Sequence, residues 1–389
     1  MHSANHRSLT LALTLALGAS LGACNKPQES QSPPTTDETT DVTPDEEAPP
    51  LVDAWYNDID ADGVPDFVEL ELSKDPNLDE CIIEACGEKA GGGELAERIN
   101  TLIILDASGS MAGKAGTKKK QSKMDVAKAA VARFAEVMPR ADVMQLGVMA
   151  FGHIGDNTEA KKEESCSKVQ MISAMGAPDP VAVKTALEPI KATGWSPIAR
   201  SIEATAQFLP EEVGVLNHII LVADGIERCD GDPVTVARQL FQTNHLTRID
   251  VVGFGIDAKE DAEALKAIAA TTGGLYVEAS DVAEFDQAFN SLTMSTWGIF
   301  DTWLCAVGSA PLLECYENRA KEAIARTERE IEFMSRYSGG QEAIATLEKV
   351  KARIEQTMEG RNRVVTTYKV NIEAIKAESD PIRKKASQR

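Results

Sequence analysis

Short apolar runs alternate with amphipathic stretches along the middle of this 389-residue chain, from residue 99 to residue 292. The stretch 124–138 places Val126, Ala130 and Phe134 on one helical stripe. Strands that alternate with such helices form parallel-rich sheets covered on both faces, so we expect one α/β domain with a mostly parallel sheet. The predicted strands are 101–105, 143–151, 218–222, 249–254 and 275–278, and the other predicted helices are 233–241 and 260–270.

The C-terminal residues show a different pattern, with two long apolar stripes separated by Ser338-Gly339-Gly340. We expect a helical hairpin with a basic tail over 316–389, joined to the domain by a connector, 293–315, that carries Trp297 and Trp303. The hairpin could pack on itself, support the domain, or form a coiled coil with a partner. The stripes consist of Leu313, Ala320, Ile324, Ile331 and Met334, then Leu347, Ile354, Val365, Tyr368, Ile372 and Ile375.

The N-terminal residues 1–23 combine a basic start, a short apolar core and small residues, which is typical of an export signal. Their end, Leu21-Gly22-Ala23-Cys24, resembles the bacterial lipobox, which implies that Cys24 is acylated and anchors the chain to a membrane. The alternative is an ordinary secretory signal with an incidental cysteine. Asn25 rather than Asp follows Cys24, which favours the outer membrane of a Gram-negative cell envelope.

The charge is concentrated near the N-terminus. Residues 25–97 hold 21 acidic residues and three lysines, in a chain of net charge −21. Within this region, residues 24–52 are rich in Pro, Thr, Ser and acids and have few large apolar residues, so we expect an unfolded tether. A nucleic-acid-binding domain needs a basic patch, and nothing in this charge distribution suggests one, so we expect no nucleic-acid partner.

Residues 58–69 place oxygen ligands at the spacing of a calcium-binding EF-hand loop, with Gly63 at the sharp turn. Pro65 and the following residues 74–77 depart from a paired EF-hand, and the segment resembles a thrombospondin type 3 repeat. We expect a small module, residues 53–90, ordered by a structural Ca²⁺; the alternative is a solvated acidic turn. The predicted ligands are Asp58, Asp60, Asp62, the carbonyl of Val64, Asp66 and Glu69.

Six cysteines remain besides Cys24, an even number that fits three disulfides in an oxidising compartment. Proximity along the chain favours Cys81 with Cys86 and Cys305 with Cys315, which leaves Cys166 for Cys229. Fifteen connectivities are open to six cysteines, so this pairing is a preference. A bridge to Cys229 would fix the loop that follows Asp224.

Three short polar motifs occur in a fixed order, and the first and third directly follow predicted strands. They are Asp106-Ala107-Ser108-Gly109-Ser110, Gly194-Trp195-Ser196-Pro197 and Ala223-Asp224-Gly225. The set resembles the metal-ion-dependent adhesion site (MIDAS) of the von Willebrand factor A (VWA) family, which implies a Rossmann-like VWA domain over 99–292. The resemblance also implies that Asp106, Ser108, Ser110, Ser196 and Asp224 hold Mg²⁺ or Mn²⁺; the family usually has Thr where Ser196 stands.

Ligation by neutral hydroxyls would leave the ion electrophilic, with a position open for a carboxylate of another molecule. The resemblance therefore implies a membrane-anchored envelope protein that binds an acidic residue of a protein ligand in a divalent-cation-dependent way, and not an enzyme. The alternatives are a scaffold in which the metal only stabilises the fold, metal loops that hold no ion, and a metal-dependent hydrolase, which would need a general base.

Overall fold

The computed structural model describes residues 64–72, 74–76, 78–86, 95–116, 121–210, 214–243, 247–256, 258–336 and 340–387. The predicted signal, Cys24 with the tether, and the predicted calcium ligands Asp58, Asp60 and Asp62 lie outside these residues. Among the residues it describes, no helix is both long and apolar enough to cross a membrane.

One six-stranded sheet forms the centre of the domain, in the order β3-β2-β1-β4-β5-β6. All neighbouring strands are parallel except β3, which runs antiparallel to β2. The predicted α/β class with a mostly parallel sheet is therefore confirmed. The strands are β1 (Arg98–Asp106), β2 (Met144–Phe151), β3 (Val169–Gly176), β4 (Val215–Ala223), β5 (Thr247–Phe254) and β6 (Tyr276–Ala279).

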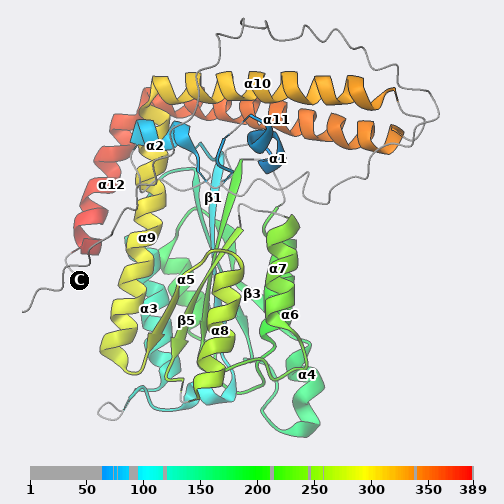
Figure 1. Ribbon diagram of the computed structural model, residues 1–389. Coiled ribbons are helices and arrows are strands. Elements are labelled where there is room, and N and C mark those ends of the chain that lie inside the picture. The colour runs from blue at the N-terminus through cyan, green and yellow to red at the C-terminus, as the bar shows by residue number, and fades with distance from the viewer. Residues whose placement is uncertain are drawn as a thin grey trace, which may run out of the picture. The chain divides into compact units, whose positions relative to one another are not determined.

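Helices cover both faces of the sheet (Figure 1). Successive side chains of a strand point to opposite faces, so Ile103 and Leu105 of β1 join one apolar cluster while Leu102 and Ile104 join the other. The first cluster includes residues of α3 (Lys123–Val137), α5 (Pro180–Leu187) and α9 (Val282–Gly308). The second includes residues of α6 (Ile198–Ala204), α7 (Pro233–Thr243) and α8 (Lys259–Thr271).

The pattern of apolar residues missed the edge strand β3 and the short helices α5 and α6. Strand β3 has no fully buried residue, and polar Gln170 and Ser173 interrupt its apolar positions. An edge strand contacts a neighbour on one side only, so it needs no continuous apolar run. The other short elements are α4 (Lys162–Cys166) and the 3₁₀ turns η2 (Gly109–Ala112), η3 (Glu159–Lys161), η4 (Thr205–Gln207) and η5 (Lys369–Asn371).

Helix α9 runs without a break past residue 292, where the sequence suggested that the connector begins. Its Trp297 and Trp303 are buried, and their indole N–H groups donate to the carbonyls of Val137 (2.9 Å) and Ala96 (3.0 Å). These bonds satisfy the polar edges of both rings and hold α9 against the domain.

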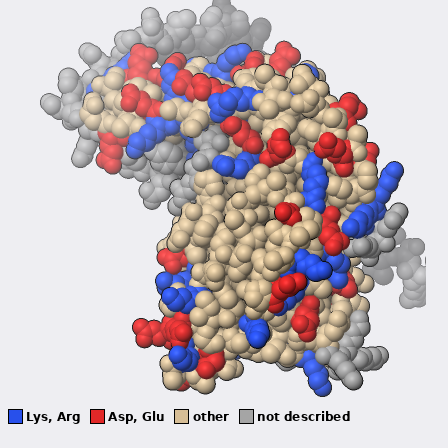
Figure 2. Space-filling view, turned by 180° about the vertical axis from the view of Figure 1, so that it is seen from behind, with Lys and Arg blue, Asp and Glu red and all other residues tan. Residues whose placement is uncertain are grey.

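Two long helices, α10 (Ala310–Met334) and α11 (Gln341–Tyr368), lie side by side (Figure 1), followed by α12 (Ile372–Ser387). Their apolar residues Ala320, Ala323, Val350 and Ile354 are buried in one cluster with Val68 of the short helix α1 (Asp66–Glu71). Part of each predicted apolar stripe, including Ala320 and Ile354, is thus buried within the chain. Acidic and basic side chains lie next to each other on the face shown in Figure 2. An ion pair between Lys351 and Glu328 joins the two long helices.

Three disulfides are present, and two of the predicted pairings are wrong. Cys81 pairs with Cys315 and Cys86 pairs with Cys305, whereas Cys166 pairs with Cys229 as predicted. Helix α2 (Glu80–Cys86) carries two of these cysteines and packs against α9 and α10. Both of its bridges therefore join distant parts of the chain, which proximity in sequence does not reveal.

Removing one of these two bridges should cost much less stability than removing both. While Cys81–Cys315 is intact, the Cys86–Cys305 bridge closes only about 15 further residues, so the substitutions C86A/C305A should lower the free energy of unfolding by about 3 kcal/mol. Removing both bridges opens a loop of 234 residues, which should cost about 5 kcal/mol more. Urea unfolding without reductant measures both values, and a peptide map with Cys81 bridged to Cys86 would contradict the pairing.

Candidate metal centre

The first and third polar motifs meet because β1 and β4 are neighbouring parallel strands. Leu105 lies opposite Val222 in the ladder, so Asp106, the last residue of β1, and Asp224, just after β4, lie at the same edge of the sheet. The strand order changes direction at β1, with β2 on one side and β4 on the other. Open α/β sheets bind ligands in the crevice at such a point.

Hydrogen bonds connect the residues of these two motifs. Asp106 Oδ1 accepts from the backbone N–H of Ser108 at 2.6 Å. The hydroxyls of Ser108 and Ser110 are 3.0 Å apart, and Ser110 Oγ donates to Asp224 Oδ1 at 2.6 Å. Four of the five predicted metal-site residues therefore form one continuous group.

The second motif is bound to the first through its backbone. Gly109 N donates to Gly194 O at 2.9 Å, and Ser108 and Gly194 form a parallel bridge. Gly152, with φ +72°, lets the loops approach, because a Cβ there would lie 2.6 Å from Ser108 N. The buried Ser196 is thereby brought to the same edge of the sheet.

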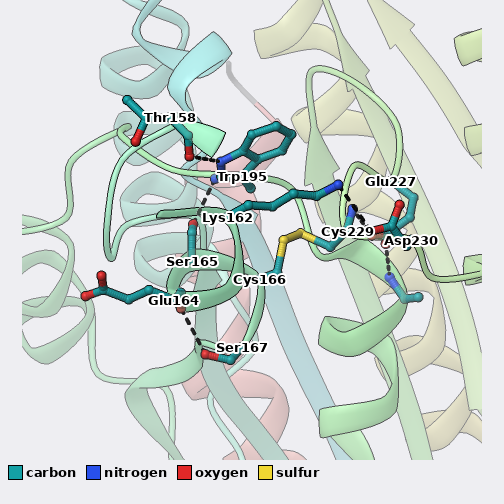
Figure 3. Close-up of a disulfide and its surroundings, with 11 residues drawn as sticks. Thr158, Lys162, Glu164, Ser165, Cys166, Ser167, Trp195, Glu227, Cys229 and Asp230 are labelled. Carbon is teal, nitrogen blue, oxygen red and sulfur yellow. Dashed lines mark hydrogen bonds and ion pairs between the residues drawn. A yellow bond between two sulfur atoms is a disulfide. The ribbon is translucent and has the colours of Figure 1, made fainter. Parts of the chain in front are cut away.

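The Cys166–Cys229 bridge joins α4 to the loop that follows Asp224 (Figure 3). Beside Cys166, the hydroxyl of Ser165 accepts from the backbone N–H of Trp195 at 2.8 Å. Beside Cys229, the N–H of Arg228 donates to the carbonyl of Ser196 at 3.0 Å. The bridge and these two bonds therefore hold the second and third motifs against each other.

Two further side chains support the same loops (Figure 3). The carboxylate of Glu227 accepts from the N–H groups of Ala199 and Cys229, both at 2.7 Å. Lys162 lies over the ring of Trp195, 5.0 Å from its centre, and pairs with Asp230 at 3.1 Å. Glu227 and Ser165 were not predicted as site residues; the only sequence signal for them is their place next to a motif or a cysteine.

The surroundings of Asp106 disfavour its ionised form. Burial of Asp106 and the nearby charge of Asp224 raise the pKa of Asp106 to about 7, although hydrogen bonds from Ser108 and from the backbone of Asp224 oppose the shift. Among the described residues, none donates a hydrogen bond of normal geometry to the buried Oδ2 of Asp106. A buried anionic oxygen without a donor is costly, so a cation at this place would be stabilising.

The donor set fits a hard divalent cation. Mg²⁺ and Mn²⁺ prefer oxygen ligands, and this site offers three hydroxyls and two carboxylates. No cluster of three or more His, Cys, Asp and Glu that could hold a metal occurs in the described part of the chain. Any ion here would thus depend on the hydroxyls of Ser108, Ser110 and Ser196.

Only Val64, Asp66 and Glu69 of the predicted calcium ligands lie in the described residues, and all three are buried. Glu69 accepts from Arg319 of α10, with Nη2 and Oε1 2.6 Å apart. In this structure the carboxylate of Glu69 thus joins α1 to α10, and the calcium site stays a prediction.

Comparison with known proteins identifies the domain. Residues 101–227 match the family model of the von Willebrand factor type A domain. The uncharacterized protein YwmD of Bacillus subtilis is 35% identical over 191 residues, which are 49% of this chain and 83% of YwmD. The chain belongs to the von Willebrand factor type A family. The VWA match spans all three polar motifs, and YwmC of the same organism is 31% identical over 50% of this chain and 83% of its own length.

Solved structures similar to this chain include the conserved hypothetical protein BatB from Bacteroides thetaiotaomicron, at 18% identity and a TM-score of 0.38, covering 51% of this chain and 97% of BatB. Another is proximal thread matrix protein 1 of the mussel byssus with a zinc-occupied MIDAS motif, at 15% identity and a TM-score of 0.40, covering 52% of this chain and 46% of that one. Likenesses at these TM-scores do not bear on the function of this chain.

The substitution Asp106→Asn should stabilise the metal-free protein by roughly 1 to 3 kcal/mol at neutral pH, because it removes a buried charge beside Asp224. This gain in the free energy of unfolding should grow as the pH rises from 3.8 to about 7. The reason is that Asp106 ionises near pH 3.8 in the unfolded chain but only near pH 7 in the folded protein. Urea unfolding with EDTA measures this, with the exposed Asp380→Asn as control. A variant less stable than the wild type would contradict the account.

The substitutions C166A/C229A should lower the free energy of unfolding by about 4 kcal/mol, because this bridge closes a loop of about 63 residues. They should also weaken Mn²⁺ binding, because the second and third motifs lose their covalent link. The matched control is C86A/C305A, which removes a bridge away from the motifs. Calorimetric titration with Mn²⁺ should show weaker binding in the first variant and unchanged binding in the control; equal loss in both would show that the bridge does not position the site.

Proposed function

We propose that this VWA domain binds a protein ligand in a divalent-cation-dependent way through Asp106, Ser108, Ser110, Ser196 and Asp224. The observation that carries the proposal is the buried Asp106 carboxylate, whose Oδ2 accepts no hydrogen bond of normal geometry from the described residues and which faces the charge of Asp224. In the proposed arrangement the three hydroxyls contact Mg²⁺ or Mn²⁺ directly, and the two carboxylates act through waters.

This arrangement favours an acidic ligand. Neutral hydroxyls withdraw little of the ion's positive charge, so the ion attracts a carboxylate from another molecule at an open coordination position. Ser110, whose side chain is exposed and bonded to Asp224, places part of the site at the surface where a partner has access.

The proposed location is the cell envelope, with Cys24 as lipid anchor in the outer membrane and residues 24–52 as tether. The three disulfides support an oxidising compartment, because such bridges are rare in the cytoplasm. We propose further that residues 53–90 bind a structural Ca²⁺ between the tether and the domain.

A scaffold with a fold-stabilising metal remains the second candidate, because the buried carboxylates alone would make metal binding stabilising. A metal-dependent hydrolase is less well supported. The two described histidines are engaged elsewhere, His153 with Gln170 and His218 with Asp250. The remaining bases at the site are Asp106 and Asp224, which the proposal assigns to the ion.

Ser110→Ala should abolish metal-dependent partner capture while leaving the fold intact, because it removes one proposed ligand and the donor to Asp224. The measurement is the capture of envelope proteins on an immobilised form of the chain that lacks the proposed lipid anchor, once with Mg²⁺ and once with EDTA. The control is Ser167→Ala, which removes an exposed hydroxyl just after α4 that donates to the carbonyl of Glu164.

A partner retained by the wild type and the control with Mg²⁺, and lost with EDTA or with Ser110→Ala, is the expected result. If the same partners bind under all conditions while Mg²⁺ still raises the melting temperature, the scaffold function is the correct one.

A further inference from the structure

A lysine reaches into the proposed metal site from outside the three motifs. Lys123 is the first residue of α3, and its Nζ donates to Asp224 Oδ2 and to the carbonyl of Gly255, both at 3.1 Å. The side chain of Lys123 is 16% exposed and that of Asp224 is fully buried. The ammonium group is thus held within the site and has little freedom to leave it.

The surrounding backbone is shaped to hold this lysine. Gly255 follows β5 with φ +62°, and a Cβ there would lie 3.0 Å from Lys123 Cε and 3.1 Å from Nζ. At the other end, Ser122 and Asp125 form a capping box that fixes the start of α3. The position of the ammonium group is therefore set by two elements independently of any ion.

Lys123 changes the charge of the site. Asp106 and Asp224 carry two negative charges when ionised, and Lys123 balances one of them. With Lys123 present, the two carboxylates and a bound divalent cation would sum to a net charge of about +1. Without the lysine, the same carboxylates and cation would sum to zero. A cation held by the proposed site would lie near the ammonium group of Lys123, and the two positive charges would repel each other.

We propose that Lys123 is a resident cation of the metal site, which lowers its affinity for divalent ions and leaves the loaded site with an excess positive charge that favours an anionic ligand. This inference rests on the proposed function and deepens it. Lys123 acts here as a positioning and specificity-determining residue through Asp224. A purely structural role for the Lys123–Asp224 pair predicts the opposite sign, since breaking the pair would then disorder the site and weaken metal binding.

Two substitutions separate charge from structure. Lys123→Met removes the charge and keeps an unbranched side chain, whereas Lys123→Arg keeps the charge. Calorimetric titration of the full soluble chain with Mn²⁺ should show roughly tenfold or greater tightening for Lys123→Met and a change of less than about threefold for Lys123→Arg. Unchanged or weaker binding by Lys123→Met overturns the proposal.

The preference for an anion is tested by repeating the Mn²⁺ titrations with sodium acetate. By linkage, a carboxylate that binds the loaded site tightens Mn²⁺ binding. Acetate should tighten Mn²⁺ binding to the wild type more than to Lys123→Met, and equal tightening overturns the anion part of the proposal.

Melting temperatures in EDTA separate this inference from the proposed function. Lys123→Met should melt several degrees below the wild type without metal and recover with Mn²⁺, because its two carboxylates lack a counter-ion. If the wild type binds no Mn²⁺ and Lys123→Met does, the role of Lys123 stands and metal-dependent binding by the natural chain falls. If neither binds Mn²⁺ and both melt alike in EDTA, the inference and the proposed function are both overturned.

Discussion

The meeting of two buried carboxylates at the ends of neighbouring parallel strands is the constraint on which the rest of the site depends. The ladder between β1 and β4 holds Asp106 and Asp224 at one edge of the sheet, where burial and the charge of Asp224 disfavour the ionised form of Asp106. Positive charge and hydrogen-bond donors stabilise such a pair of carboxylates. Ser108 and Ser110 supply donors, and Lys123 supplies a charge.

The fold holds these groups in place through neighbouring residues that are not themselves proposed ligands. Glycines at 152 and 194 allow the loops to approach, and the Cys166–Cys229 bridge with Glu227 fixes the loops after β4 and around Ser196. Short loops of this kind would otherwise be mobile. The covalent bridge therefore contributes most where the proposed function needs a fixed arrangement of hydroxyls.

Much of the fold and of the grouping of the polar motifs could be predicted from sequence, because strand ends and polar motifs are local features. Asp106, Ser108, Ser110 and Asp224 could be singled out because their two motifs directly follow apolar runs, whereas Ser196 was singled out by the family resemblance of the second motif. That these five residues hold a metal stays a prediction. The partners of Cys81 and Cys86 could not be found, because they depend on how α2 packs against α9 and α10. Lys123 was missed for the same reason: a lysine at the start of an amphipathic helix is ordinary until the helix start is placed beside Asp224.

The central claim is that Ser108, Ser110 and Ser196 hold a divalent cation between Asp106 and Asp224. Anomalous diffraction from crystals soaked in Mn²⁺ tests it most directly, because it locates the ion without relying on a partner. The account predicts one strong peak at bonding distance, about 2 Å, from the serine hydroxyls. A Mn²⁺-soaked crystal with no peak among these five side chains, and with Lys123 still bonded to Asp224, would contradict it.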